Sequence, residues 1–323
     1  MPIKPLFTRL KPYFRWVILG GTLLFIAKTL KDHWQEVAGI EFTNQAWGMV
    51  TVAFVITLVA HVWSGWVWHW VLILFDQPLS GFWSTPIYLK TNIAKYLPGN
   101  VWHFFGRIRA LQTVGTPTGI AVLGVVMEPL LMAVAALIVA CLTGGALTEI
   151  GGQFGNRGGQ TLGRVVVLVL AIASVHPRAF NPILQALGQA KAKAQKLELS
   201  VGQKGLRTYP GRALLGEMGF VLLRSLGFVA IVLAFQPLSL ANIQSLLAAF
   251  SLAWLLGLIV PGAPGGIGVF EATAISLLDT QFPVAVILSS VAIYRLISVL
   301  AEVSAAGGVW IISPLTGSNN RGK

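Results

Sequence analysis

The sequence predicts an all-α, polytopic transmembrane bundle of about seven or eight helices, with two Pro/Gly-broken or re-entrant segments. Only 11% of the 323 residues are charged, whereas an ordinary soluble domain has roughly 25%. Residues 225–270 contain no Asp, Glu, Lys, Arg or His, and residues 42–75 contain no Asp, Glu, Lys or Arg. A helix needs about 20 apolar residues to span a bilayer. Neither run alternates as a barrel strand would, so helices are expected.

The predicted elements form one transmembrane domain over residues 1–323, with a first half of about 1–160 and a second half of about 161–323. The first predicted span follows four basic residues and has no small-residue cleavage site, so we expect it to be retained rather than removed as a signal peptide. The shorter segments 86–98 and 264–279 are interrupted. The predicted spans are residues 16–30, 47–75, 117–142, 162–176, 212–235, 243–260 and 283–312.

The net charge of +12 is concentrated between the predicted spans. Basic residues gather at the N-terminus, in residues 90–109 and in residues 178–212. Basic loops stay in the cytoplasm, so we expect a multi-pass protein of the inner (plasma) membrane with a cytoplasmic N-terminus. Residues 178–210 are predicted to be a cytoplasmic connector with a basic amphipathic helix on the inner leaflet. This distribution indicates a membrane surface and gives no reason to expect nucleic acid.

Two stretches, one in each half, break an apolar segment with Pro-Gly and then restart a helix. They are LKTNIAKYLPGNVWHFFGRIRA (89–110) and LLGLIVPGAPGGIGVFEATA (255–274), which continue to Arg107 and to Glu271. Paired interrupted segments are the best sequence pointer to a transporter site built from broken helices. Broken backbone at membrane depth occurs only where protein buries it or a cavity lines it. A cavity is therefore predicted, while an inverted repeat and a chance likeness of the two halves stay equally open.

Ionisable residues inside the predicted spans sharpen this expectation. A charge at the bilayer centre costs at least about 2.5–3.5 kcal/mol, so each needs a partner, a cavity or a function. For Arg224, Glu271 and Arg295, a substrate site and a structural interhelical ion pair stay open, whereas the ion pair is favoured for Glu302. His103 lies four residues before Arg107 and is expected on the same helix face, where both could meet an anionic headgroup. Glu128 and Glu217 are the remaining members of this group.

No stretch of the chain has the pattern of a common catalytic or cofactor motif. GAPGGIG does not meet the dinucleotide spacing, and the Walker lysine, GxSxG and HExxH are missing. His61 and His69 share a helix face and are predicted to make helix contacts rather than to bind a metal. We therefore expect no cofactor and no metal, and a transporter rather than an enzyme.

The two broken stretches also carry a resemblance. KYLPGNVWHFFGR and VPGAPGGIGVFEA, together with Arg295 in the following span, resemble the signature blocks of the lysylphosphatidylglycerol synthase transmembrane-region family, also described as flippase-like. The resemblance implies a bundle that moves a lipid or lipid-linked molecule between leaflets, with Arg107, Glu271, Arg295 and, less closely, Glu217 as functional positions. The multiple peptide resistance factors of this family add a soluble aminoacyl-transfer domain. This chain ends at Lys323, so we do not expect it to make lysyl-lipid itself.

The predicted function is movement of an anionic phospholipid or polyprenyl-linked carrier between leaflets. Arg107 and Arg295 would pair with a headgroup phosphate, while Glu271 and Glu217 balance those charges or receive a proton. A membrane-embedded lipid-carrier transferase and a non-catalytic partner of a separate soluble glycosyltransferase or synthase stay open. The predicted substrate-binding residues are Asn100, His103, Arg107, Glu217, Arg224, Gly265, Gly266, Glu271 and Arg295.

Overall fold

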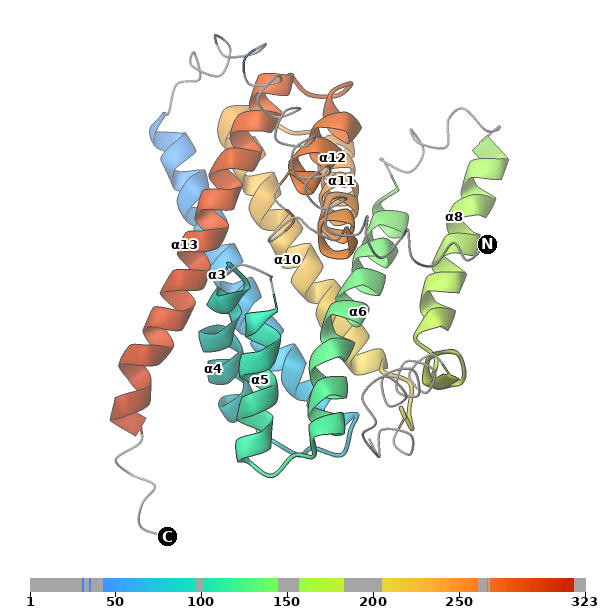
Figure 1. Ribbon diagram of the computed structural model, residues 1–323. Helices are drawn as coiled ribbons and strands as arrows, with labels where there is room; N and C mark the ends of the chain where they lie inside the picture. Colours follow the sequence, from blue (N-terminus) through green and yellow to red (C-terminus); the bar gives the residue numbers. More distant parts are fainter. Residues whose placement is uncertain are drawn as a thin grey trace, which may run out of the picture.

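The computed structural model describes residues 31, 35, 43–96, 101–144, 157–182, 205–260, 266 and 268–316. Within these ranges the chain forms helices and turns and contains no strand (Figure 1). The predicted all-α polytopic bundle is confirmed. The predicted first span, residues 16–30, and most of the amphipathic connector, residues 183–204, lie outside the described part.

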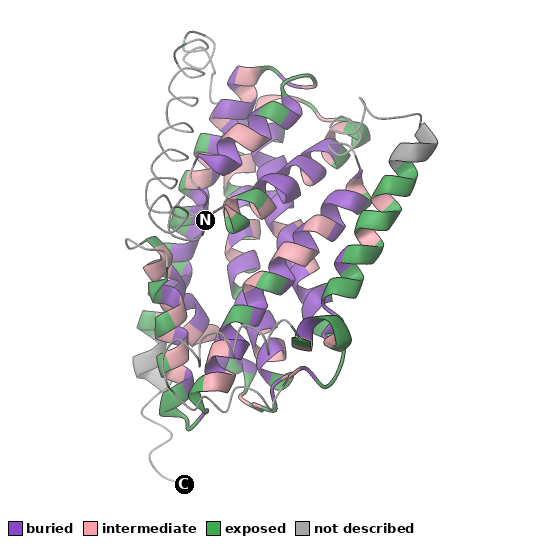
Figure 2. Cartoon of the chain, turned by 45° about the vertical axis from the view of Figure 1, so that its right-hand side comes forward, coloured by how far each residue is buried: buried purple, intermediate pink, exposed green. Residues whose placement is uncertain are grey.

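Five described helices are long and apolar enough to cross a membrane. Their outer faces carry exposed Val and Leu side chains, as expected for surfaces that meet lipid, while the inner faces are buried (Figure 2). The five are α3 (Asn44–Ile73), α6 (Thr118–Thr143), α10 (Gly211–Phe235), α11 (Leu240–Ile259) and α13 (Val284–Thr316). The shorter elements are α4 (Gly81–Asn92), the 3-10 helix η1 (Ile93–Tyr96), α5 (Trp102–Thr113), α8 (Arg157–Ser174) and α12 (Val269–Leu278).

Side-chain caps fix where several helices begin. Thr43 accepts a hydrogen bond from the backbone N–H of Ala46 before α3, and Ser80 caps α4 in the same way. Ser239 and Asn242 form a reciprocal capping box at the start of α11. Each cap satisfies backbone donors that have no partner within the helix, so these residues explain the starts of α3, α4 and α11.

The helices α3 and α10 pack closely because small residues line their contact. The α-carbon of Gly216 faces Trp70, and a Cβ atom there would lie 2.8 Å from that ring. Trp63 donates its indole N–H to the Gly216 carbonyl at 2.8 Å. Small residues let membrane helices approach, and hydrogen bonds between helices add to the packing. This pair forms the frame on which the shorter helices are placed.

The helices α4 and α5 form a hairpin that enters the bundle and turns back. Each has 12 residues, or about 18 Å of helix, which is too short to cross the hydrocarbon core. Figure 1 shows the two side by side in the lower half of the bundle, joined by η1 and a short connection. The predicted Pro98-Gly99 break falls in that connection, outside the described residues.

A second hairpin, α11 followed by α12, lies in the upper half of the view in Figure 1. The chain thus twice places two helices between a pair of long ones: α4 and α5 between α3 and α6, then α11 and α12 between α10 and α13, where α11 is itself long enough to cross a membrane. This is the order that an inverted repeat requires, although a repeat at the level of residues stays a prediction. The Pro261-Gly262 break lies outside the described residues.

The basic residues of segment 90–109 were counted with the loops between the predicted spans, but the described part of this segment forms the end of α4, η1 and most of α5. Arg107 is 1% exposed, and Lys95 has an ion-pair partner inside the bundle. A cation that pairs with a buried carboxylate can leave the membrane surface, so the basic residues of this segment do not all mark a surface loop.

The turn after α3, which leads into the first hairpin, and the segment before α10 lie on one face of the bundle. Arg207 Nη1 lies 3.6 Å from Asp76 Oδ2, joining the two turns at the surface. Asn181 also bonds both the N–H and the C=O of Leu206, so the ends of the long connector meet. The base of the first hairpin and the two described ends of the connector, residues 178–182 and 205–210, therefore lie on the same face of the bundle.

Two glycines position the second hairpin. Gly266 has φ +71°, and a Cβ atom there would lie 2.9 Å from the Gly257 α-carbon in α11. Only glycine combines this backbone conformation with so close an approach.

We expect Gly266→Ala to lower the free energy of unfolding by about 1–3 kcal/mol, because it adds both strain and a backbone clash. Thermal unfolding of the detergent-solubilised protein measures the change. Gly307→Ala on α13 is the matched control, since nothing lies within 4 Å of its added Cβ atom, and its stability should stay equal or rise by up to about 1 kcal/mol. Equal melting temperatures for the two variants would contradict the close approach.

Candidate functional site

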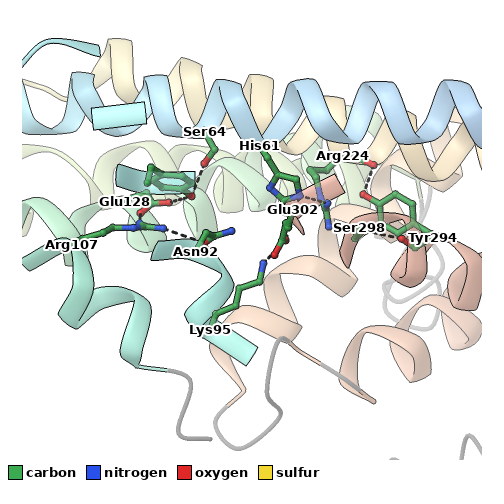
Figure 3. A network of polar contacts seen from close by, with 11 residues as sticks. His61, Ser64, Asn92, Lys95, Arg107, Glu128, Arg224, Tyr294, Ser298 and Glu302 are labelled. Atoms are coloured by element: carbon green, nitrogen blue, oxygen red, sulfur yellow. Dashed lines mark hydrogen bonds and ion pairs between the residues drawn. The ribbon is translucent and has the colours of Figure 1, made fainter. Parts of the chain in front are cut away.

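A cavity of about 660 Å³ lies where the two hairpins and the long helices meet. Both halves of the chain contribute to it, from His61 on α3 to Glu302 on α13. Figure 3 shows the polar contacts at its wall. The ionisable lining residues are His61, Tyr88, Lys95, Tyr96, His103, Arg107, Glu128, Arg224, Glu271, Tyr294, Arg295 and Glu302.

The first hairpin brings Arg107 against α6. Its guanidinium donates to a carboxylate oxygen of Glu128 and, at 3.2 Å, to Asn92 Oδ1. The Tyr88 hydroxyl donates to the other Glu128 oxygen at 2.5 Å, and its ring stacks 3.7 Å from the guanidinium. Arg107 and Glu128 are 1% and 3% exposed. This buried pair fixes the hairpin to the long helix.

The second hairpin is fixed through Glu271. One carboxylate oxygen accepts from the Gly268 backbone N–H at 2.6 Å, which caps α12, and the other accepts from Arg295 Nε at 2.7 Å. Arg295 also donates to the Gly266 carbonyl at 3.1 Å. Glu271 therefore ties the glycine-rich break, the start of α12 and the middle of α13 together. The interhelical ion pair that stayed open for Glu271 and Arg295 is present.

A third cluster joins four elements across the centre of the cavity. Lys95 of η1 donates to Glu302 Oε1 at 2.5 Å, and His61 Nε2 lies 3.3 Å from the same oxygen. Arg224 Nη1 of α10 lies 3.1 Å from His61 Nε2 (Figure 3). The Tyr294 hydroxyl supports α10 by donating to the Arg224 carbonyl at 2.9 Å.

The cavity carries more positive than negative charge. Its described lining has four Lys or Arg side chains and three carboxylates. Three of the cations are ion-paired: Arg107 with Glu128, Lys95 with Glu302 and Arg295 with Glu271. Arg224 has no carboxylate within ion-pair distance among the described residues, and its Nε is buried without a hydrogen-bond partner. Arg224 is thus the cation with unused binding capacity.

The cavity also has apolar lining residues that face outward. Leu130 on α6, Ile259 on α11 and Leu296 on α13 line the cavity and are 40%, 56% and 60% exposed. Trp254 and Phe270 add aromatic surface farther in. A molecule with a charged head and an apolar tail would therefore meet matching surface at both ends.

The structure brings most of the predicted substrate-binding residues to this cavity. His103, Arg107, Arg224, Gly266, Glu271 and Arg295 all line it. Glu217 does not: it is fully buried on α10, and neither carboxylate oxygen has a hydrogen-bond partner among the described residues. Asn100 and Gly265 lie outside the described residues. Binding of a substrate by any of these residues stays a prediction.

Sequence reasoning missed several residues of the site. Lys95 was counted as a loop cation, His61 as a helix contact, and Tyr88 was not considered. The only signals in the sequence were the place of Lys95 three residues before Pro98 and the ionisable character of Glu128 and Glu302 inside apolar spans. In the described ranges, no three His, Cys, Asp or Glu side chains are grouped so that they could hold a metal ion.

Comparison with known protein families gives a match. The model of a family described as the lysylphosphatidylglycerol synthase TM region matches residues 15–306, which is most of the chain and includes both hairpins. No curated protein matches the chain significantly.

We expect Glu128→Gln to lower the free energy of unfolding by about 3–5 kcal/mol, because it leaves Arg107 buried without a carboxylate. Thermal unfolding in detergent measures the loss. Asp76→Asn removes the carboxylate of an exposed ion pair and should cost no more than about 1 kcal/mol. A loss for Glu128→Gln no larger than that of this control would show that the buried pair does not hold the hairpin.

Proposed function

The chain belongs to the lysylphosphatidylglycerol synthase transmembrane-region family, and on this premise we propose that it moves an anionic phospholipid or polyprenyl-linked carrier between leaflets. The observation that carries the proposal is the excess cation Arg224, buried in a cavity of about 660 Å³ that both halves of a membrane bundle line. Pockets of this size hold a small ligand.

A headgroup phosphate suits this cavity for electrostatic reasons. A buried cation without a counter-charge is costly in a membrane, and a singly charged phosphodiester would compensate the charge of Arg224. Arg224 retains an Nε–H donor without a partner, and charge-assisted hydrogen bonds to phosphate are among the strong ones. Trp254 and Tyr294 rings lie 5.1 Å from the guanidinium carbon and hold it in place.

The ion pairs around Arg224 limit how tightly the cavity can bind a headgroup, which a transported lipid requires because it must also be released. Lys95 and Arg295 are balanced by Glu302 and Glu271, so the cavity does not present four free cations to a phosphate. A site that bound too tightly would trap its ligand in mid-membrane. Paired cations can exchange a carboxylate for the phosphate while it passes, and take the carboxylate back afterwards.

The exposed apolar residues at the cavity support a route for the rest of the lipid. Leu130, Ile259 and Leu296 are both cavity-lining and exposed on the lipid side. Acyl or prenyl chains would stay in contact with this surface and with the bilayer, so only the headgroup has to be taken out of water.

We place the chain in the inner membrane with its N-terminus in the cytoplasm. The support is the basic segment 178–212, which by the positive-inside rule stays cytoplasmic. Its two ends lie on the same face as the base of the first hairpin.

Reconstitution into vesicles tests the proposed function. Fluorescent phosphatidylglycerol is incorporated in both leaflets, and a membrane-impermeant quencher reports how fast the inner pool reaches the outside. We expect the wild type to accelerate this exchange and Arg224→Gln to slow it by about tenfold or more, because a hydrogen bond to a charged group contributes about 1.5–3 kcal/mol.

Arg212→Gln is the matched control, since Arg212 is an exposed arginine of the same helix that stacks on Trp70 and does not line the cavity. It should exchange lipid at the wild-type rate. If wild type, Arg224→Gln and empty vesicles all gave the same rate with phosphatidylglycerol, phosphatidic acid and a polyprenyl phosphate, the flippase proposal would be wrong.

A further inference from the structure

The Nε2 atom of His61 lies close to a hydrogen-bond donor and to a hydrogen-bond acceptor. His61 Nε2 lies 3.1 Å from Arg224 Nη1 and 3.3 Å from Glu302 Oε1. A guanidinium can only donate hydrogen bonds, and an ionised carboxylate can only accept them. A nitrogen that carries no proton accepts from Arg224, whereas a protonated one donates to Glu302, so Nε2 cannot satisfy both partners at once.

The position of His61 therefore has two alternative hydrogen-bonding arrangements. In the first, unprotonated Nε2 accepts from Arg224 and holds its guanidinium, while Glu302 Oε1 accepts from Lys95. In the second, Nε2–H donates to Glu302 and Arg224 is released. Both partners have spare capacity for the exchange, because Arg224 Nε and Glu302 Oε2 are buried without a hydrogen-bond partner among the described residues.

The surroundings of His61 leave few other groups to take part. Among the described residues, the charged or titratable groups that face it are Glu302 from α13, Arg224 from α10 and Lys95 from η1. Tyr96, also of η1, faces Glu302. His61 and Glu302 are 2% and 3% exposed, so bulk water does not screen their interaction.

The helices α4 and α6 also pack on α3 and bring their own titratable pair. This pair, Tyr88 and Glu128, contacts α3 at Ser64, three residues further along the helix, through the 2.7 Å bond between Ser64 and Tyr88. Arg107 is already paired there. These groups leave the His61 exchange to Arg224 and Glu302.

We propose that binding of a phosphate anion to Arg224 is coupled to uptake of one proton by the His61–Glu302 pair. The inference rests on the proposed function and names the co-substrate of the same site. The bond from Arg224 to His61 Nε2 breaks, and the guanidinium donates to a phosphate oxygen instead. His61 then takes up a proton from the aqueous phase at Nε2 and becomes an imidazolium. The new N–H group donates a hydrogen bond to Glu302 Oε1.

Charge balance in the cavity gives the reason for the coupling. A singly charged phosphodiester adds one negative charge to a site that water does not reach freely, and one proton restores the net charge. Moving an uncompensated charge through the hydrocarbon is costly, whereas the anion and proton together cross as a neutral unit. A pH difference across the membrane can then drive the anion toward the more alkaline side.

The test measures binding of dihexanoyl phosphatidylglycerol to the purified full-length chain in detergent, from about pH 5.5 to 8. The probe is a phosphodiester whose own charge does not change in this range. Linkage of one proton weakens binding by up to about tenfold per pH unit as the pH rises. Calorimetry of the wild type in two buffers of different ionisation enthalpy counts the protons directly and should give about one per ligand.

His61→Gln is the informative variant, because a glutamine carries a donor and an acceptor at all pH values and can serve both partners without a proton. We expect it to bind with an affinity that changes less than about twofold over the same range. His69→Gln on the same helix is the matched control, since His69 Nδ1 lies 2.6 Å from the Leu79 carbonyl oxygen and His69 does not line the cavity. It should keep the wild-type pH dependence.

The outcomes separate this inference from the proposed function. If the wild type binds the probe without proton uptake, or if His61→Gln keeps the wild-type slope, the coupling is overturned while the anion site stands. If the wild type does not bind the probe or other phosphate lipids, the proposed function fails and the coupling fails with it. The calorimetric count needs no variant, so it decides the question even if His61→Gln does not fold.

Discussion

The cost of a charge inside a membrane protein is the constraint on which the rest of this structure depends. Water solvates such a charge poorly, so a side chain that stays charged there is stabilised by a partner within the bundle. The cavity meets this constraint three times over with ion pairs that join different elements: α5 to α6, η1 to α13 and α12 to α13. The same pairs that balance the charges therefore also hold the two hairpins in place. Arg224 is left without a carboxylate within ion-pair distance among the described residues, and the proposal that the site takes an anion rests on this excess cation.

The backbone follows a related constraint. A peptide group in lipid must be hydrogen-bonded within the protein, so a helix can break only where neighbouring groups satisfy it. Glu271 does this by accepting from the Gly268 N–H, and Arg295 by donating to the Gly266 carbonyl. Two of the side chains that line the cavity, Glu271 and Arg295, thus also support the broken backbone, so an exchange of their partners would bear on the position of the hairpin.

Much of the fold could be predicted from the sequence because uncharged runs and caps are local signals. The predicted span 212–235 differs from α10, Gly211–Phe235, by one residue at its start. The pairing of charges was less accessible. Lys95 and Glu302 are 207 residues apart, and packing rather than local pattern brings them together. Charge clustering assigned Lys95 and Arg107 to a surface loop. A rule that counts cations along the sequence takes no account of the carboxylates with which these residues pair inside the bundle. The dual contact of His61 depends on three helices at once, and no spacing within α3 could reveal it.

The central claim is that the excess cation selects an anionic headgroup, and retention of lipid by the purified protein tests it most directly. The protein is equilibrated with equal amounts of phosphatidylglycerol and phosphatidylcholine, which differ in headgroup charge, and native mass spectrometry counts the bound molecules of each. The account predicts that phosphatidylglycerol is retained over phosphatidylcholine, that Arg224→Gln loses this preference and that Arg212→Gln keeps it. Equal retention of both lipids by the wild type would contradict the account.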